Sequence, residues 1–155
     1  MKVTRMKTKL LILLAIPAMF YACKKDTYTT KPQISIKSIN ATTLSQGDLL
    51  LFQLEFTDKE GDIQDTLWVQ KFSRNCPATP GATFISKNKV PNFTATSNLK
   101  GTLELGYAYN ANLQGYSPIT GCGTKNDTAY FKFWLKDKAQ NMSDTITTGN
   151  IILLK

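Results

Sequence analysis

Alternating apolar and polar residues dominate the chain after residue 33, and this period of two predicts β-strands. The clearest case is residues 50–56, where four apolar side chains share one face of an extended chain: Leu50, Phe52, Leu54 and Phe56. The same alternation predicts further strands within residues 34–39, 63–72, 102–109, 127–136 and 143–154. No window of this region keeps a helical period of apolar residues over three turns, so we expect an all-β fold.

The first 22 residues follow a different pattern, a basic segment and then a short apolar run. Four basic residues and no acid precede the apolar residues 10–22. At about 1.5 Å per residue, a helix of that length reaches about 20 Å, short of the roughly 30 Å hydrocarbon core of a bilayer. The layout is typical of an export signal that is cleaved, here over residues 1–22.

The end of this segment resembles the lipobox of bacterial lipoproteins, since it reads Phe20-Tyr21-Ala22-Cys23. The resemblance implies cleavage before Cys23, lipid on that cysteine and a polar tether over residues 23–32. The charged residues after Cys23 resemble those of lipoproteins of the Bacteroidota, which implies an outer-membrane lipoprotein and, in that group, display on the cell surface. Two or more acyl chains hold firmly, since each buried methylene contributes about 0.8 kcal/mol.

Two long stretches, residues 73–98 and 110–126, lack a clear period and are expected to be irregular loops. Each contains one cysteine, Cys76 in the first and Cys122 in the second. With Cys23 carrying lipid, these two remain as a pair in a chain bound for an oxidising compartment, so we expect a disulfide between them. The alternative is two free thiols. Metal binding by them is not favoured, because the chain has no histidine and no CxxC spacing.

The charge of the chain argues against binding to nucleic acid. The sequence has 19 Lys and Arg against 11 Asp and Glu, a formal net charge of +8. Four basic residues belong to the export signal, and 19 minus 4 leaves 15 against 11 in the exported part, about +4. These residues form no basic block. We therefore expect the partners to be the membrane, through the lipid, and another envelope protein or a glycan.

Two hairpins resemble a known family. One reads FTDKEGDI over residues 56–63 and resembles the first hairpin of immunoglobulin-like and cadherin-like modules of bacterial surface proteins. The other reads FWLKDKAQNMSD over residues 133–144 and resembles their penultimate strand and turn, with Gln140 where glycine is usual. The resemblance implies that residues 33–155 form an immunoglobulin-like antiparallel β-sandwich of about seven strands.

The first hairpin is rich in acids, since Asp58, Glu60, Asp62 and Asp65 lie within eight residues. The resemblance implies that Asp137 approaches them from the second hairpin. Calcium takes six to eight oxygen ligands at about 2.3–2.6 Å, so Asp58, Glu60, Asp62 and Asp137 are candidate calcium ligands. The alternative is that these acids make turn hydrogen bonds and keep the hairpin tip solvated. The sequence favours this alternative, because the spacing differs from that of an EF-hand.

Aromatic residues are the second candidate site, because flat amphipathic rings stack on sugars. Tyr116, in a predicted loop, is the best candidate for ligand contact, followed by Tyr109 and Trp134. The alternative is packing, with Trp68 or Trp134 in the core and other rings covering the outer face of a sheet.

No catalytic signature accompanies these residues. Without histidine, a hydrolase needs a Ser-Lys pair, paired carboxylates or a metal, and none of the usual spacings is present. We therefore expect a non-catalytic, lipid-anchored envelope protein that acts as an accessory or interaction module and needs no cofactor. The alternative is a module that binds a glycan or is stiffened by calcium.

Overall fold

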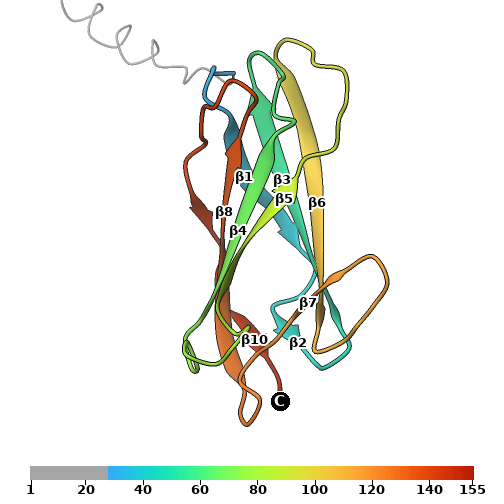
Figure 1. Cartoon of the computed structure of the whole chain (residues 1–155), viewed down its shortest axis with the longest axis vertical. Coiled ribbons are helices and arrows are strands. Elements are labelled where there is room, and N and C mark those ends of the chain that lie inside the picture. The colour runs from blue at the N-terminus through green and yellow to red at the C-terminus, as the bar shows by residue number, and fades with distance from the viewer. Residues whose placement is uncertain (1–27) are drawn as a thin grey trace, which may run out of the picture.

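The computed structural model describes residues 28–155 as two β-sheets that pack face to face (Figure 1). The predicted export signal, Cys23 and residues 24–27 lie outside the described residues. No helix in the described part is long and apolar enough to span a membrane. The strands are β1 (Gln33–Ile39), β2 (Thr43–Leu44), β3 (Leu49–Asp58), β4 (Thr66–Ser73), β5 (Phe84–Lys89), β6 (Leu99–Tyr109), β7 (Ser117–Ile119), β8 (Asp127–Lys136), β9 (Ile146–Thr147) and β10 (Ile151–Leu153).

The prediction of an all-β fold is confirmed. One sheet has the order β1-β3-β6-β7, and the other has the order β2-β10-β8-β4-β5 with β9 paired to β8. The expected sandwich is confirmed in its two packed sheets, but the sheets are not wholly antiparallel and the strands outnumber the expected seven or so. Ten strands are present in residues 28–155, and the β2–β10 and β6–β7 pairs are parallel. The chain changes sheet between β1 and β2, which brings β2 beside the C-terminal strand in the same direction.

The predicted alternation places apolar side chains between the sheets. Leu50, Phe52 and Leu54 of β3 have no exposed surface, and Phe131 and Phe133 of β8 are equally buried. The Phe52 ring centroid lies 4.9 Å from that of Phe131 and 5.0 Å from that of Phe133, so the two sheets meet at these rings. Burying each of these side chains contributes about 1.5–3 kcal/mol, which makes this contact the centre of the core.

Two local expectations are corrected. The stretch 73–98 is not all irregular, because β5 lies within it and forms the edge of the six-stranded sheet. The strand expected over residues 63–72 begins at Thr66, and Ile63 is buried in the preceding loop. Gln140, at the position where glycine was expected from the hairpin resemblance, has the left-handed turn conformation with φ of 73°.

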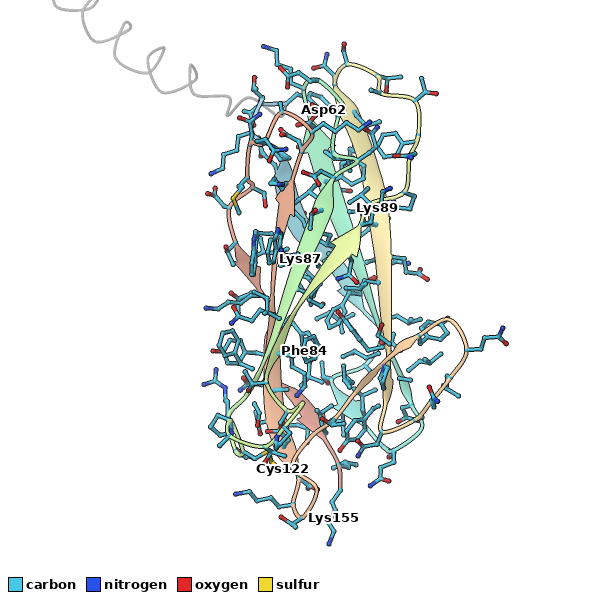
Figure 2. The ribbon with its side chains drawn as sticks, in the orientation of Figure 1. Asp62, Phe84, Lys87, Lys89, Cys122 and Lys155 are labelled. Carbon is cyan, nitrogen blue, oxygen red and sulfur yellow. A yellow bond between two sulfur atoms is a disulfide. The ribbon has the colours of Figure 1, made fainter. Side chains whose placement is uncertain are left out.

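The sandwich has two ends that differ in chemistry (Figure 2). Asp62 lies at the end where β3 turns into β4, and there the backbone N–H of Lys59 donates to the carbonyl of Thr29. This is therefore the end at which the tether joins the domain. Cys122 lies at the opposite end, near the C-terminal residue Lys155.

Candidate functional site

The predicted acidic site is assembled from two turns at the tether end. Asp58 ends β3, Asp62 lies in the β3–β4 turn and Asp137 follows β8. One carboxylate oxygen from each lies within 4.8 Å of the others, and we call these three residues the acidic cluster. Glu60 is not part of it, because its exposed carboxylate accepts a hydrogen bond from the Thr30 hydroxyl at 3.1 Å. Of the four calcium ligands predicted from the sequence, three therefore lie together in the acidic cluster, and the fourth, Glu60, lies outside it.

Each of the two turns is closed by an aspartate. Asp58 Oδ2 accepts hydrogen bonds from the backbone N–H groups of Gly61 at 2.6 Å and Asp62 at 3.1 Å. Asp137 does the same in the second turn, where its Oδ1 accepts from the N–H of Asn141 at 2.7 Å. The N–H of Lys138 donates to the carbonyl of Asp62 at 2.9 Å and joins the turns. The expected turn role of these acids is therefore confirmed for Asp58 and Asp137.

Position 61 of this turn requires glycine for two reasons. Its φ of 72° lies in the left-handed region that glycine adopts without strain. A Cβ at this position would lie 2.1 Å from the carbonyl oxygen of Thr96, in the loop between β5 and β6. The turn can pack against that loop only because position 61 has no side chain.

The acidic cluster is buried and negatively charged. Asp58 and Asp137 have no exposed surface, while Asp62 is half-buried. Burial raises the pKa of Asp58, the turn N–H groups of Asp62 and Gly61 oppose that rise, and the neighbouring carboxylates of Asp62 and Asp137 add to it. The Oδ1 atoms of Asp58 and Asp62 are buried without a hydrogen-bond partner.

The second candidate site is the outer face of the six-stranded sheet. Trp68 of β4 stacks on Trp134 of β8, with ring centroids 5.6 Å apart, and Phe72 stacks on Tyr130 at 4.9 Å. All four side chains are half-buried and none lies in the core, so the expected core role for Trp68 or Trp134 is wrong. Strand alternation explains the position, because Leu67 and Val69 occupy the inner face.

Cations surround these stacked rings. Lys87 lies on β5 (Figure 2), and its ammonium is 4.4 Å from the centroid of Trp68. The Lys132 ammonium lies 5.0 Å from the centroid of Phe72, and the Arg74 guanidinium lies 4.7 Å from that of Tyr130. Such contacts contribute about 0.5–1 kcal/mol at exposed sites. We call these four rings and three cations the aromatic–cationic face.

The structure changes the assignment of the two tyrosines predicted to contact a ligand. Tyr109 is buried, and its hydroxyl donates to the carbonyl of Leu154 at 2.7 Å, so it packs the core and is not a ligand contact. Tyr116 is half-buried, with its ring on Gly106, where an added Cβ would lie 2.6 Å from ring carbons. One face of the Tyr116 ring therefore holds its loop against β6.

A groove that the sequence did not reveal runs along the edge of β5. It has a volume of about 420 Å³, and Lys87, Lys89, Pro91, Leu103 and Glu104 contribute to its lining. Lys87 belongs both to this groove and to the aromatic–cationic face, so the two surfaces are continuous. The groove was missed because β5 lies in a stretch without a hydrophobic period.

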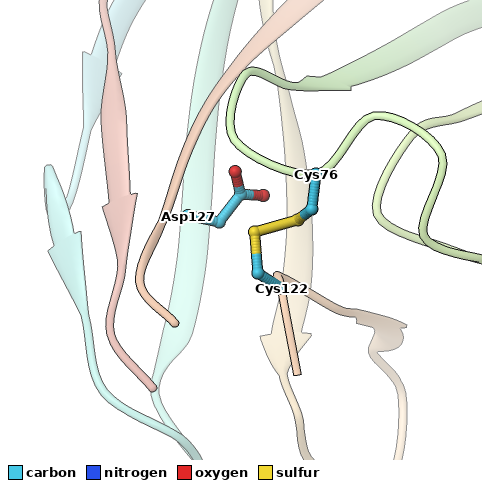
Figure 3. Close-up of side chains that lie close together, drawn as sticks. All are labelled: Cys76, Cys122 and Asp127. Carbon is cyan, nitrogen blue, oxygen red and sulfur yellow. A yellow bond between two sulfur atoms is a disulfide. The ribbon is translucent and has the colours of Figure 1, made fainter. Parts of the chain in front are cut away.

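The predicted disulfide is present at the other end of the domain. Cys76 and Cys122 are joined across 46 residues of sequence, and Asp127 lies beside them (Figure 3). Both sulfurs are used in the bridge, so the three residues are not a metal site. The Ser73 hydroxyl links the two features, because it donates to Asp127 Oδ1 at 2.7 Å and lies 3.1 Å from Cys76 Sγ.

A buried ion pair beside the bridge was not predicted. Lys71 Nζ lies 3.7 Å from Asp127 Oδ2, and neither side chain has exposed surface. The Lys71 ammonium also donates to the carbonyls of Ala82 and Thr120. Burial lowers the pKa of Lys71 to about 8, and the nearby Asp127 carboxylate opposes that shift.

Comparisons with known proteins give little further information. No family model matches the chain, and no curated protein matches it. A solved structure that is similar is that of Spo0M, a sporulation control protein from Bacillus subtilis, with 8% sequence identity and a TM-score of 0.41. The match covers 82% of this chain and 51% of that chain, so this chain spans about half the length of Spo0M. A likeness at this level does not establish a shared function.

Proposed function

We propose that this protein is a non-catalytic, lipid-anchored lipoprotein of the outer membrane, whose immunoglobulin-like domain binds a partner at the cell surface. The observation that carries the binding role is the aromatic–cationic face, which presents half-buried rings and cations on a regular sheet. Interface cores in proteins are enriched in aromatic residues and arginine and depleted in lysine, so the four rings and Arg74 are the part of this face that suits the core of an interface.

The strand order supports the immunoglobulin-like assignment. In variable-type immunoglobulin domains, strands A, B and E share one sheet, while C′, C, F and G share the other. Here β1, β3 and β6 are neighbours in one sheet, and β5, β4, β8 and β10 occur in the other with β5 at its edge. The two orders correspond strand for strand over these seven elements. The anchor rests on the sequence around Cys23 alone.

The anchor predicts a defined mass for the mature protein. Protein purified from its native membrane is expected to have the mass of residues 23–155 plus acyl groups, because export removes residues 1–22 and lipid is attached to Cys23. Intact mass spectrometry measures this. The matched control is Cys23→Ser, which is expected to leave the membrane fraction. A chain that retains residues 1–22, or an unlipidated chain in the membrane, would contradict the proposal.

An acidic glycan is the candidate partner that the aromatic–cationic face favours, because aromatic rings contact sugars and exposed cations attract their carboxylates or sulfates. Lys87→Glu is therefore expected to weaken binding to acidic polysaccharides by about tenfold or more, since it places like charges together. Glycan arrays with neutral and acidic polysaccharides measure this. Lys37→Glu is the matched control, because Lys37 is exposed on β1 of the other sheet.

Comparing Lys87→Glu with Lys37→Glu tests which surface binds, and the set of polysaccharides tests whether the ligand is a glycan. Equal losses in Lys87→Glu and Lys37→Glu would show a general charge effect and would reject the aromatic–cationic face. Absence of binding to every polysaccharide would reject the glycan and leave a protein partner. In that case a photo-crosslinking residue at Ile85, which is 55% exposed on β5, is expected to capture the partner in intact cells, and the same residue at Lys37 is not.

A further inference from the structure

The acidic cluster has more charge than its turns require. Hydrogen bonds within the turns use Asp58 Oδ2 and both oxygens of Asp137, the second of which accepts from the Asn141 amide at 2.9 Å. They do not use Asp58 Oδ1 or Asp62 Oδ1, and both atoms are buried. The turn role therefore accounts for part of the acidic cluster and leaves two oxygens without a partner.

In the part of the chain that the structure describes, no ion pair involves Asp58, Asp62 or Asp137. Among residues 28–155, the ion pairs of the structure involve other acids: Asp144, Asp127, Glu55 and Asp65. Taking a carboxylate out of water costs several kcal/mol unless a cation or hydrogen bonds replace the solvent. Two neighbouring carboxylates add repulsion to that cost. Within residues 28–155, the acidic cluster therefore has two buried oxygens without a hydrogen bond and no paired cation.

We propose that Asp58, Asp62 and Asp137 bind a calcium ion at the tether end of the domain. Carboxylate oxygens are the hard ligands that this cation prefers, and two Ca–O bonds of about 2.3–2.6 Å span about 4.6–5.2 Å. The three oxygens lie within 4.8 Å of one another, which is within that span. Calcium accepts irregular geometry, and water completes its coordination. Magnesium is a poorer match, because it requires a near-ideal octahedron of closer ligands.

A cation at this position joins three segments of the chain. Asp58 and Asp62 belong to the β3–β4 turn, and Asp137 belongs to the turn after β8. The tether contacts the same two turns, since the carbonyl of Thr29 accepts from Lys59 N–H and that of Thr30 accepts from the Asn141 amide. Calcium would therefore stiffen the end of the domain from which the chain leads to residue 23. This regulation of the tether goes beyond the proposed binding role.

The test uses the full-length protein in detergent, stripped of metal with EDTA. It is expected to bind one calcium ion per chain with a dissociation constant of about 10⁻⁴–10⁻³ M, the range of extracellular modules. Isothermal titration calorimetry measures the affinity. At about 10 mM calcium the thermal unfolding midpoint is expected to rise by about 5 °C. Hydrogen exchange of the backbone N–H groups of Gly61 and Asn141, which donate to Asp58 and Asp137, is expected to slow.

Asp62→Asn is the informative variant, because the Asp62 side chain closes neither turn and its Oδ1 has no partner. It is expected to weaken calcium binding by about tenfold or more. Without calcium it is expected to be at least as stable as the natural chain, because one of three repelling charges is removed. Glu60→Gln removes the same charge from the same turn outside the acidic cluster and is expected to bind calcium within about twofold of the natural chain.

Three results would overturn the inference. The first is absence of any heat or thermal shift with calcium in the natural chain. The second is an unchanged affinity in Asp62→Asn, and the third is magnesium binding as tight as calcium binding. A loss in Asp62→Asn with retention in Glu60→Gln supports it. These results are independent of the anchor and of the aromatic–cationic face, which lie elsewhere in the chain.

Discussion

Replacing Lys71 with methionine is expected to lower the free energy of unfolding by about 3–5 kcal/mol, the usual effect of leaving one partner of a buried ion pair uncompensated. Asp127 would lose its paired cation in a site without exposed surface. It would keep the hydrogen bond from Ser73, which satisfies Oδ1 alone. Oδ2 would lose the Lys71 ammonium at 3.7 Å and would have no hydrogen bond. Denaturant unfolding measures the change.

The double variant Lys71→Met with Asp127→Asn tests the reason for this effect. It removes both charges, and the side-chain amide oxygen introduced at position 127 can still accept from Ser73 and Asn75. More than half of the lost stability is therefore expected to return, because replacing both members of a buried pair is often nearly neutral. If the double variant is no more stable than Lys71→Met, the loss comes from packing of the lysine chain and not from the unpaired charge.

Removing the disulfide is expected to have the second large effect. Replacing Cys76 and Cys122 with serine releases a loop that the bridge closes over 46 residues, and the chain-entropy model gives about 4 kcal/mol for a loop of this length. The bridge joins the segment after β4 to the segment before β8. Thermal unfolding with and without a reductant measures the effect, and reduction is expected to lower the midpoint of the natural chain alone.

The loss of stability on removing Lys71 and the loss on removing the disulfide are not independent, because the ion pair and the bridge lie side by side. Cys76 N–H donates to the Ser73 hydroxyl at 3.0 Å, and that hydroxyl donates to Asp127. Thr120, two residues before Cys122, accepts from Lys71 at 2.9 Å. The combined variant is therefore expected to be less destabilised than the sum of the two effects, because contacting residues are not additive. A loss below about 1 kcal/mol on removing the disulfide would contradict the entropic account.

The acidic cluster shows how far a local pattern predicts a site. Asp58 and Asp62 are close in sequence, so the β3–β4 turn alone brings them together. Asp137 is far along the chain, and its approach was expected from the likeness of two hairpins to one family. Glu60 satisfied the same pattern but points to the tether. The side chains of neighbouring residues in a turn point in different directions, so spacing in the sequence alone does not select the residues of a site.

The alternation of residues by itself determined the class of fold and the inner face of the main strands. Because side chains alternate across a strand, Leu50, Phe52 and Leu54 had to share one face, and burying that face provides the main free energy of folding. The cysteines likewise predicted the bridge, because the expectation that Cys23 carries lipid left Cys76 and Cys122 as one pair. Both conclusions depend on patterns that are local or can be counted.

Only the tertiary structure decided the features that depend on partners distant in the chain. Strands β2, β5 and β7 are short or have little apolar character, and they exist because a neighbouring strand offers hydrogen bonds. Lys71 continues the inner face of β4, and Asp127 on the neighbouring β8 compensates its burial. A sequence shows which groups need partners, but folding decides which groups meet, because hydrogen bonds and charges act over a few ångströms of space.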